Sequence, residues 1–235
     1  MKRLYRGGGE PGMESVLANG VVLNRRALLL SALLLGASSQ AAQGGTRPNG
    51  THDIQAADPE RLYVALEDNG FNVPSVRYRK LDPRFWRRRV IDLTGATEGT
   101  VFVSLAERFL YFVIGDGTAI RYGIAIGKDG YRWSGNGEIA RIATWPKWTP
   151  TMEMRARLPE LERYRSGMPG GPENPLGARA LYIHRNGRDT LYRVHGTPEW
   201  WSIGRQASSG CIRMLNQDVI DLAARVQPGA AIIVL

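Results

Sequence analysis

Two stretches of the chain carry a dense β-strand pattern, which constrains the fold more than any other feature. Between residues 99 and 127, segments rich in aromatic and β-branched residues alternate with glycine turns, and strands are expected at Thr100–Val103, Phe109–Val113 and Ala119–Ile126. A second stretch predicts strands at Ala180–His184 and Leu191–His195, joined by Asn186-Gly187, a strong hairpin signal. The sequence therefore predicts a mainly β protein.

One helix is expected near the end of the chain. Asn216 is placed to cap a helix from Gln217 to about Val226, whose apolar residues recur at helical spacing, and Pro228-Gly229 ends it. The apolar segment 230–235 predicts a last buried strand. By contrast, residues 133–177 are dense in Gly, Pro and Trp and predict a long irregular segment of the kind that forms a lid or a binding loop.

The first 41 residues have the layout of a secretory signal. A positive pair, Arg25-Arg26, precedes an apolar run of eleven residues, and Ser39-Gln40-Ala41 fits a cleavage site after Ala41. The alternatives are an uncleaved anchor and a buried helix, although the run is short for a span, which needs about 20 apolar residues. Residues 1–41 are therefore interpreted as a signal peptide, exported by the Sec or the twin-arginine route.

Residues 42–97 are expected to form a linker and an N-terminal extension. Gly, Pro, Asn and Asp dominate as far as about residue 60, and residues 60–92 look loosely structured. The segment 84–89 mixes aromatics with arginines, and a solvated lead-in to the first strand is favoured over a nucleic-acid strip because no nucleic-acid fold follows. The net charge of +9 suits an anionic lipid, a nucleic acid or a cell-wall polymer without choosing among them.

Cys211 is the only cysteine of the chain, and His195 is one of three histidines. A lone cysteine in an exported protein cannot pair within its chain, so it is either a small buried residue or a thiol kept for its chemistry. A nucleophilic thiol needs a base, and backbone N–H groups around Gly210 and Cys211 could hold an oxyanion. Gly196 and Gly210 fit tight turns beside the two residues. The spacing alone is weak evidence for a catalytic pair.

The residues around the pair are similar to a known family. His195-Gly196-Thr197 and the run Ser208-Ser209-Gly210-Cys211-Ile212-Arg213-Met214, with Asn216 and Asp218, resemble the signature of the L,D-transpeptidase catalytic domain, of the YkuD type and ErfK/YbiS-like. The resemblance covers residues 98–235, which are expected to form the catalytic domain, and extends to segments around Trp133, Trp145-Pro146-Lys147-Trp148, Pro169 and Asn174-Pro175-Leu176-Gly177. It implies a mixed β-sandwich with one helix after the cysteine.

The resemblance also implies site roles. Cys211 would be the nucleophile and His195 the general base and acid, with Gly196 orienting the imidazole and Ser209 and Gly210 shaping the oxyanion hole. The expected substrate-binding residues are Thr197, Ser208, Arg213 and Trp148. Many members carry histidine where Ser209 stands, so no side-chain role is carried over to that position. No metal or cofactor is implied.

A peptidoglycan L,D-transpeptidase of the periplasm is the function that follows from the resemblance, with roles in cell-wall biogenesis and cell shape. Its cysteine would attack a tetrapeptide stem, release D-alanine and form a thioester that an amine resolves. The acceptor would be a stem peptide, an outer-membrane lipoprotein or a barrel protein, and carbapenem-type β-lactams would inhibit. The alternatives are a hydrolase of the same family, such as a carboxypeptidase or an enzyme that releases wall-linked proteins, and a wall-binding domain with a dead site. No nucleic-acid partner is expected.

Overall fold

The computed structural model describes residues 58–127, 133–207 and 211–235. Within this part of the chain, eleven strands form one mixed sheet with the order β11-β7-β12-β10-β9-β8-β13-β4-β5-β6-β3. The strands are β3 (Arg88–Ile91), β4 (Val101–Ser104), β5 (Phe109–Val113), β6 (Thr118–Gly123), β7 (Ala125–Gly127), β8 (Gly135–Thr144), β9 (Arg179–Arg185), β10 (Arg188–Thr197), β11 (Gln206–Ala207), β12 (Ile212–Leu215) and β13 (Ala231–Val234).

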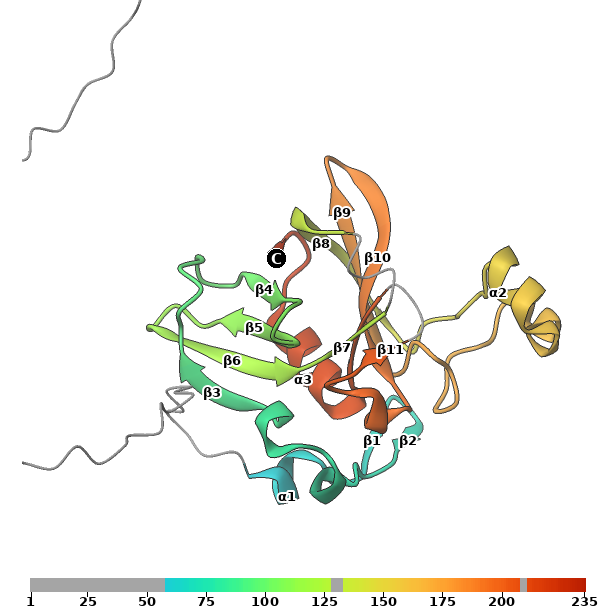
Figure 1. Cartoon of the computed structure of the whole chain (residues 1–235), viewed down its shortest axis with the longest axis horizontal. Coiled ribbons are helices and arrows are strands. Elements are labelled where there is room, and N and C mark those ends of the chain that lie inside the picture. Colours follow the sequence, from blue (N-terminus) through green and yellow to red (C-terminus); the bar gives the residue numbers. More distant parts are fainter. Residues whose placement is uncertain (1–57, 128–132, 208–210) are drawn as a thin grey trace, which may run out of the picture. The chain divides into compact units, whose positions relative to one another are not determined.

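The sheet is curled on itself, which makes it the mixed β-sandwich that was expected. β6 and β7 are separated only by Ile124, yet eight strand-to-strand steps lie between them in the sheet order. A flat sheet would put them roughly 38 Å apart at the usual strand spacing, so the two ends of the sheet must approach each other. Figure 1 shows the layer of β4, β5 and β6 facing the layer of β8, β9 and β10.

The core fills the space between the layers. Alternate residues along the strands face inward because strand side chains have a period of two, as in β4, where Val101 and Val103 are fully buried. The helix α3 (Asn216–Arg225) contributes Val219 and Leu222 to the same cluster. The other members are Leu105, Leu110, Tyr122, Ile124, Ile126, Ile139, Leu181, Ile183, Val194, Ile212, Met214, Val226, Ile232 and Val234. The predicted strand Phe109–Val113 and the predicted terminal strand are confirmed.

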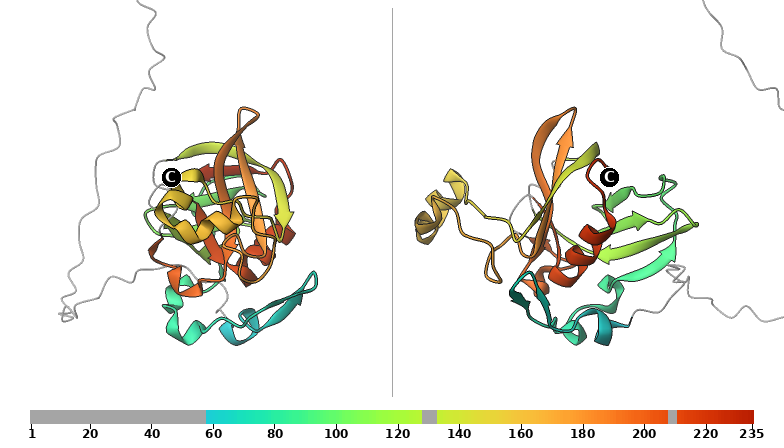
Figure 2. Two further views of the ribbon diagram at one scale, coloured as in Figure 1. Left: turned by 90° about the vertical axis from the view of Figure 1, so that its right-hand side faces the viewer. Right: turned by 180° about the vertical axis from the view of Figure 1, so that it is seen from behind.

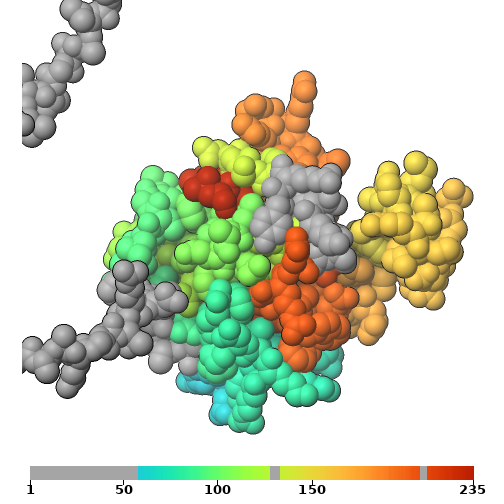
Figure 3. All heavy atoms as spheres, viewed as in Figure 1, coloured from blue at the N-terminus to red at the C-terminus, as the bar shows by residue number. Residues whose placement is uncertain are grey.

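Part of the segment expected to be irregular is a ten-residue strand. β8 occupies Gly135–Thr144 between β9 and β13. Its pairing with β9 shifts register between Ile139 and Arg141, so the inward-facing residues Ile139 and Ile142 are three apart rather than two. This bulge breaks the alternation by which strands are recognised, and the prediction of an irregular segment was wrong here. Beyond β8, α2 (Met152–Arg157) and the 3-10 helix η4 (Pro159–Tyr164) form a lobe that projects from the sheet (Figures 2 and 3).

Residues 60–92 were expected to be loosely structured, and this prediction was wrong, because residues 58–91 pack closely on the sheet. They form α1 (Pro59–Leu62), the hairpin β1 (Leu66–Asp68) and β2 (Phe71–Val73), the 3-10 helices η1 (Tyr78–Lys80) and η2 (Pro83–Phe85), and β3, which pairs with β6. Tyr63, Leu81 and Phe85 are buried in a second apolar cluster with residues of the sheet. Asp68 receives two hydrogen bonds of 2.7 and 2.8 Å from Arg179 at the start of β9.

The arginine-rich segment 84–89 makes internal contacts. Arg87 forms ion pairs with Asp218 and Asp221 of α3, at 3.7 and 3.1 Å. Arg89 donates to Thr118 at 2.9 Å and is also paired with Asp116. These contacts tie the segment to α3 and β6, and its last two residues belong to β3, so the segment is not a solvated lead-in.

Asn216 does not cap α3. The helix begins at Asn216 itself, and Leu215 precedes it without a side-chain cap. The amide oxygen of Asn216 accepts instead from the backbone N–H of Ala178 at 3.0 Å. The expected helix is otherwise confirmed to within a residue at each end. No helix within the described ranges is both long and apolar enough to cross a membrane.

Candidate active site

Strand register brings the histidine and the cysteine to one face of the sheet. β10 and β12 run parallel, with Val194 opposite Ile212 and His195 opposite Arg213. Val194 and Ile212 point into the core, so His195 and Arg213 point to the other face. Cys211 lies two residues before Arg213 and therefore shares its face, next to β10. Sixteen residues of sequence separation are thus reduced to neighbouring positions on two adjacent strands.

The His195 imidazole is held in one tautomer. Its Nδ1 lies 2.6 Å from the backbone oxygen of Gly196, and the side chain is only 3% exposed. A carbonyl only accepts, so Nδ1 carries the proton and Nε2 is left as the free acceptor of the neutral ring. Burial lowers the pKa of His195 to about 4, and the positive charges of Arg213 and Arg193 act in the same direction, against the hydrogen bond to Gly196. The ring is therefore a neutral base at pH 7.

Cys211 is half-buried and immediately precedes β12. Its backbone oxygen accepts from the N–H of Gly127 at 3.2 Å, which ties the residue to β7. Burial raises the pKa of the thiol above its ordinary value of 9.0, while the backbone N–H and the guanidinium of Arg193, and the charge of Arg213, oppose the shift. At neutral pH the two groups are therefore a thiol and a neutral imidazole, not a thiolate and an imidazolium.

The backbone around His195 is packed so closely that only glycine fits. A Cβ on Gly196 would lie 2.3 Å from the amide oxygen of Asn216, and one on Gly177 would lie 2.6 Å from the carbonyl carbon of Gly196. Gly177 also has a φ of +61°, which side chains rarely adopt. The oxygen of Asn216 holds Ala178 in this junction. Gly177, Gly196 and Asn216, which all lie in segments that resemble the family, therefore contact one another next to the backbone oxygen that binds the imidazole.

Asn174 ties together the loops beside this junction. Its side chain is fully buried, and its amide nitrogen donates to the carbonyls of Pro146, Met168 and Pro169 at 3.1, 3.2 and 2.8 Å. Its oxygen accepts from the N–H of Leu176 at 2.9 Å. A buried amide with its groups satisfied by backbone fixes loop positions that no strand ladder holds. The Trp145-Pro146 turn is therefore tied to the segment that leads into β9.

Arg213 is anchored by an acidic residue that follows β10. Its guanidinium donates to Glu199 at 2.8 Å, and its side chain is largely buried. Thr197, predicted to bind substrate, is buried, and its hydroxyl accepts from the N–H of Glu199 at 3.2 Å. The Thr197 hydroxyl is therefore engaged in the turn that places Glu199 against Arg213.

The remaining predicted site residues are less closely defined. Ser208, Ser209 and Gly210 lie outside the described residues, so the expected oxyanion hole stays a prediction. Trp148 is half-buried and pairs through its backbone with Met168, at the base of the α2–η4 lobe. Trp145, by contrast, is buried against Phe71 of the N-terminal hairpin, with ring centroids 4.7 Å apart.

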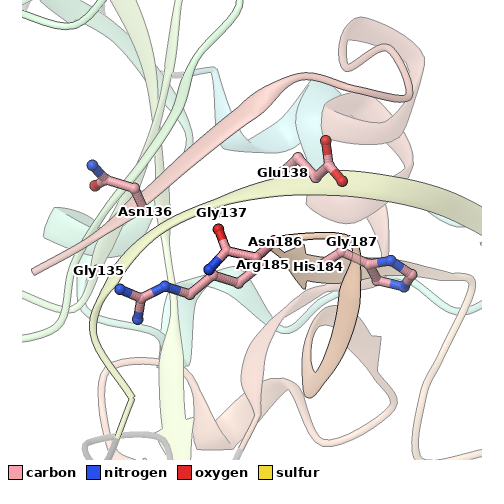
Figure 4. Close-up of a pocket in the computed structure, with 8 residues that line it drawn as sticks. All are labelled: Gly135, Asn136, Gly137, Glu138, His184, Arg185, Asn186 and Gly187. Atoms are coloured by element: carbon pink, nitrogen blue, oxygen red, sulfur yellow. The ribbon is translucent and has the colours of Figure 1, made fainter.

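A pocket of about 580 Å³ lies away from this pair, where β8 begins and β9 ends (Figure 4). It is lined by Gly135, Asn136, Gly137, Glu138, His184, Arg185, Asn186 and Gly187. His184 is four residues along β9 from Ala180, the partner of His195, so the pocket is about 13 Å from the Cys/His row. None of the predicted site residues lines it, and His184 at the end of the predicted strand Ala180–His184 forms part of its wall.

Two features of the site were missed from the sequence. Arg193 lies one residue before the Val194–Ile212 pair, beside Cys211, and nothing in its local sequence marks it as different from the other arginines. Asn174 was noted only as part of the resemblance, and Asn216 only there and as a helix cap, whereas the contacts that they make join loops distant in sequence. Among the described residues, no three His, Cys, Asp or Glu side chains come together as a metal site.

A mixed β-sandwich with a cysteine and a buried histidine on the outer face of two parallel strands defines the class of protein. The chain belongs to the YkuD family, the L,D-transpeptidase catalytic domain, whose model matches residues 98–234. The match begins where the resemblance was placed.

Relatives and solved structures include members of the same family. The chain is 36% identical over 140 residues to the probable L,D-transpeptidase YbiS of Escherichia coli K12, covering 57% of this chain and 44% of that protein. It is 36% identical over 139 residues to the probable L,D-transpeptidase ErfK/SrfK of Salmonella typhimurium, covering 57% and 43%. The chain thus spans less than half the length of the curated relatives it matches.

Two crystal structures complete the comparison. A Brucella melitensis protein described as a probable carnitine operon oxidoreductase is 45% identical, covering 68% of this chain and 99% of that one, with a TM-score of 0.47. An L,D-transpeptidase from Mycobacterium tuberculosis H37Rv is 16% identical, covering 58% and 57%, with a TM-score of 0.41.

Proposed function

We propose that this protein is a peptidoglycan L,D-transpeptidase with Cys211 as nucleophile and His195 as general base and acid. The observation that carries the proposal is the placement of the two side chains on one face of β10 and β12, with Nδ1 of His195 bonded to Gly196. This bond leaves Nε2 as the proton acceptor on a ring that is neutral at pH 7. Membership of the YkuD family supports the choice of substrate.

The first half-reaction forms a thioester. Nε2 of His195 takes the thiol proton as the Cys211 sulfur attacks the carbonyl carbon between the third and fourth stem residues. The C–N bond to D-alanine then breaks, and the departing amine takes the proton from His195. The backbone N–H groups of Gly210 and Cys211, with Ser208 and Ser209 shaping the loop, are proposed to hold the oxyanion. Because the proton moves from the thiol to His195 as the sulfur attacks, the mechanism does not require a thiolate–imidazolium pair before substrate binds.

The second half-reaction restores the thiol. An acceptor amine attacks the thioester carbonyl, passes its proton to His195, and expels the Cys211 sulfur, which recovers the proton. Arg213 is fixed by Glu199 and is proposed to bind a substrate carboxylate, with Thr197 and Trp148 as further substrate-binding positions. The acceptor is proposed to be a stem peptide or a wall-linked lipoprotein or barrel protein.

Export to the periplasm is part of the proposal, supported by the charged, apolar and small-residue segments of residues 24–41. Fractionation of cells that carry a tagged full-length chain would test it. Protein that stays in the cytoplasmic fraction at full mass would contradict export, whatever its activity.

The function is tested with purified protein, muropeptides and mass spectrometry. We expect wild type to exchange a D-amino acid onto a disaccharide-tetrapeptide and to gain the mass of a carbapenem, and the folded Cys211→Ala variant to do neither. Exchange by Cys211→Ala would exclude the thiol as nucleophile. Loss of D-alanine with water as the sole acceptor would assign a hydrolase, and failure of wild type in both assays would indicate a non-catalytic domain.

A further inference from the structure

A row of side chains crosses the outer face of the sheet and ends at the thiol. Arg141 of β8 is opposite Tyr182 of β9, and Tyr182 is opposite Arg193 of β10. Arg193 precedes Val194 as Cys211 precedes Ile212, so the parallel register continues the row to Cys211. The flanking residues Leu181, Val194 and Ile212 face the core, which directs the row to the opposite side.

The aromatic ring at the centre of this row is contacted by two cations. The guanidinium carbon of Arg141 lies 3.6 Å from the centroid of the Tyr182 ring, and that of Arg193 lies 4.3 Å from it. Because the two arginines come from the strands on either side of β9, each cation approaches the ring from its own flank. Stacking on an aromatic face fixes the plane of a guanidinium. The N–H edge of Arg141 stays available to a ligand, whereas that of Arg193 donates to Asp189 and to the backbone oxygen of Tyr192.

The charges of the two arginines are not equally compensated. Arg193 donates to both oxygens of Asp189 at 2.7 Å, and a register shift in β10 between these two residues brings the carboxylate within reach. Arg141 is exposed and has no carboxylate partner among the described residues. The row therefore keeps one uncompensated positive charge, held by the Tyr182 ring and not by a counter-ion.

The row also bears on the reacting groups. The backbone N–H of Arg193 donates toward the Cys211 thiol. The charge of Arg193 lowers the pKa of Cys211, which burial raises, and also lowers the pKa of His195, which burial lowers too. At the usual strand spacing the row spans roughly 14 Å from Cys211 to Arg141, the length of about four extended residues. A peptide that reaches the thiol across this face passes over both guanidinium groups.

We infer that Arg141 and Arg193, stacked on Tyr182, form a carboxylate-binding subsite for the peptide that occupies the site of Cys211. The inference rests on the proposed function for the identity of the peptide, since stem peptides carry several carboxylates. The exposed guanidinium of Arg141 can bind a carboxylate with two parallel hydrogen bonds. Arg193 makes its two parallel hydrogen bonds to Asp189, so it contributes positive charge beside Cys211. The carboxylate belongs either to the acyl donor or to the acceptor, and both sources share this chemistry.

The peptide experiment measures turnover with matched substrates. Wild type, Arg141→Gln and Arg193→Gln are given a disaccharide-tetrapeptide with free carboxylates and the same compound with its carboxylates converted to carboxamides. Arg61→Gln is the matched control, because Arg61 is an exposed arginine of α1 outside the row. Amidation of the donor alone and of the acceptor alone forms separate arms, which identify the source of the carboxylate.

We expect amidation to cost wild type and Arg61→Gln about tenfold in kcat/KM in one arm, equal to about 1.4 kcal/mol, and to cost Arg141→Gln little. Arg141→Lys should recover only part of the preference, since lysine keeps the charge without the planar fork. Equal amidation ratios in wild type and in both glutamine variants would overturn the subsite. Circular dichroism melts identify any variant that fails to fold, and the exposed Arg141 position keeps the test decisive should Arg193→Gln unfold.

A second measurement does not depend on the enzyme activity. Iodoacetate and iodoacetamide alkylate the single cysteine with loss of iodide and differ only in carboxylate against amide, so their rate ratio cancels changes in thiolate fraction. We expect the ratio to fall several-fold in Arg193→Gln and to stay unchanged in Arg61→Gln. If wild type turns over no muropeptide, the proposed function fails, but the iodoacetate to iodoacetamide ratio still tests the arginines. A ratio that is the same in wild type and Arg193→Gln then overturns the subsite. A changed ratio with unchanged amidation ratios also overturns a peptide subsite.

Discussion

The ionisation state of Cys211 gives the sharpest test of the site chemistry, because the chain has a single cysteine and any alkylation reports on it. Burial keeps the pKa of the thiol above 9.0, and the pKa of His195 near 4 keeps the ring neutral. A thiol with such a pKa is less than about 1% thiolate at pH 7. In a thiolate–imidazolium pair the order would be reversed. The pKa of the thiol would lie below that of the imidazole, and both groups would be charged between those two values.

The assay is the rate of alkylation by iodoacetamide between pH 6 and 8, with thiolate absorbance at 240 nm as a second probe. We expect the rate to rise about tenfold per pH unit, or about 100-fold in total, since only the thiolate reacts. His195→Ala should leave this profile nearly unchanged, because a neutral ring does not stabilise the thiolate by charge. A rate that is flat across this range, and that His195→Ala abolishes, would refute the neutral pair.

Four further predictions concern stability. His195→Asn should abolish turnover and change the pH dependence of unfolding: a folded pKa of about 4, against 6.5 in the unfolded chain, means that wild type loses about 3 kcal/mol relative to the variant as pH falls from 7 to 4, measured by urea unfolding at each pH. An identical pH dependence in both proteins would contradict the buried neutral ring. Burial raises the pKa of Asp218 to about 7, so Asp218→Asn should gain stability relative to wild type as pH rises from 4 to 8; a constant difference would argue against this shift. Asp68→Ala removes the carboxylate that accepts from Arg179 and one of the two acceptors of the Trp145 indole, and should cost roughly 3 kcal/mol, with a truncated chain that lacks residues 58–91 more strongly destabilised; the backbone oxygens of residue 68 and Ala178 still accept from the indole and from Arg179. Gly196→Ala places a methyl group 2.3 Å from the Asn216 oxygen and should lower both Tm and activity, whereas Gly187→Ala, in an open turn with φ +70°, should cost about 1 kcal/mol and spare activity.

The local pattern was enough to identify much of the sheet. Phe109–Val113, the hairpin around Asn186-Gly187 and the helix after the cysteine follow from alternation, turn residues and helical spacing. β8 escaped detection because its bulge between Ile139 and Arg141 breaks the alternation. The N-terminal strands are three or four residues long, and tertiary contacts such as Asp68–Arg179 stabilise them more than any local preference.

The sequence by itself determined which residue is proposed as the nucleophile, because a single thiol within the family motif leaves no other cysteine to choose. It also determined that the chain is mainly β. Only the tertiary structure decided that Cys211 and His195 share a face, since this depends on the parallel register of two strands that are not joined by a hairpin. Tertiary structure likewise aligned Arg141, Tyr182 and Arg193 in one row, because cross-strand neighbours are set by pairing and bulges and not by distance along the chain.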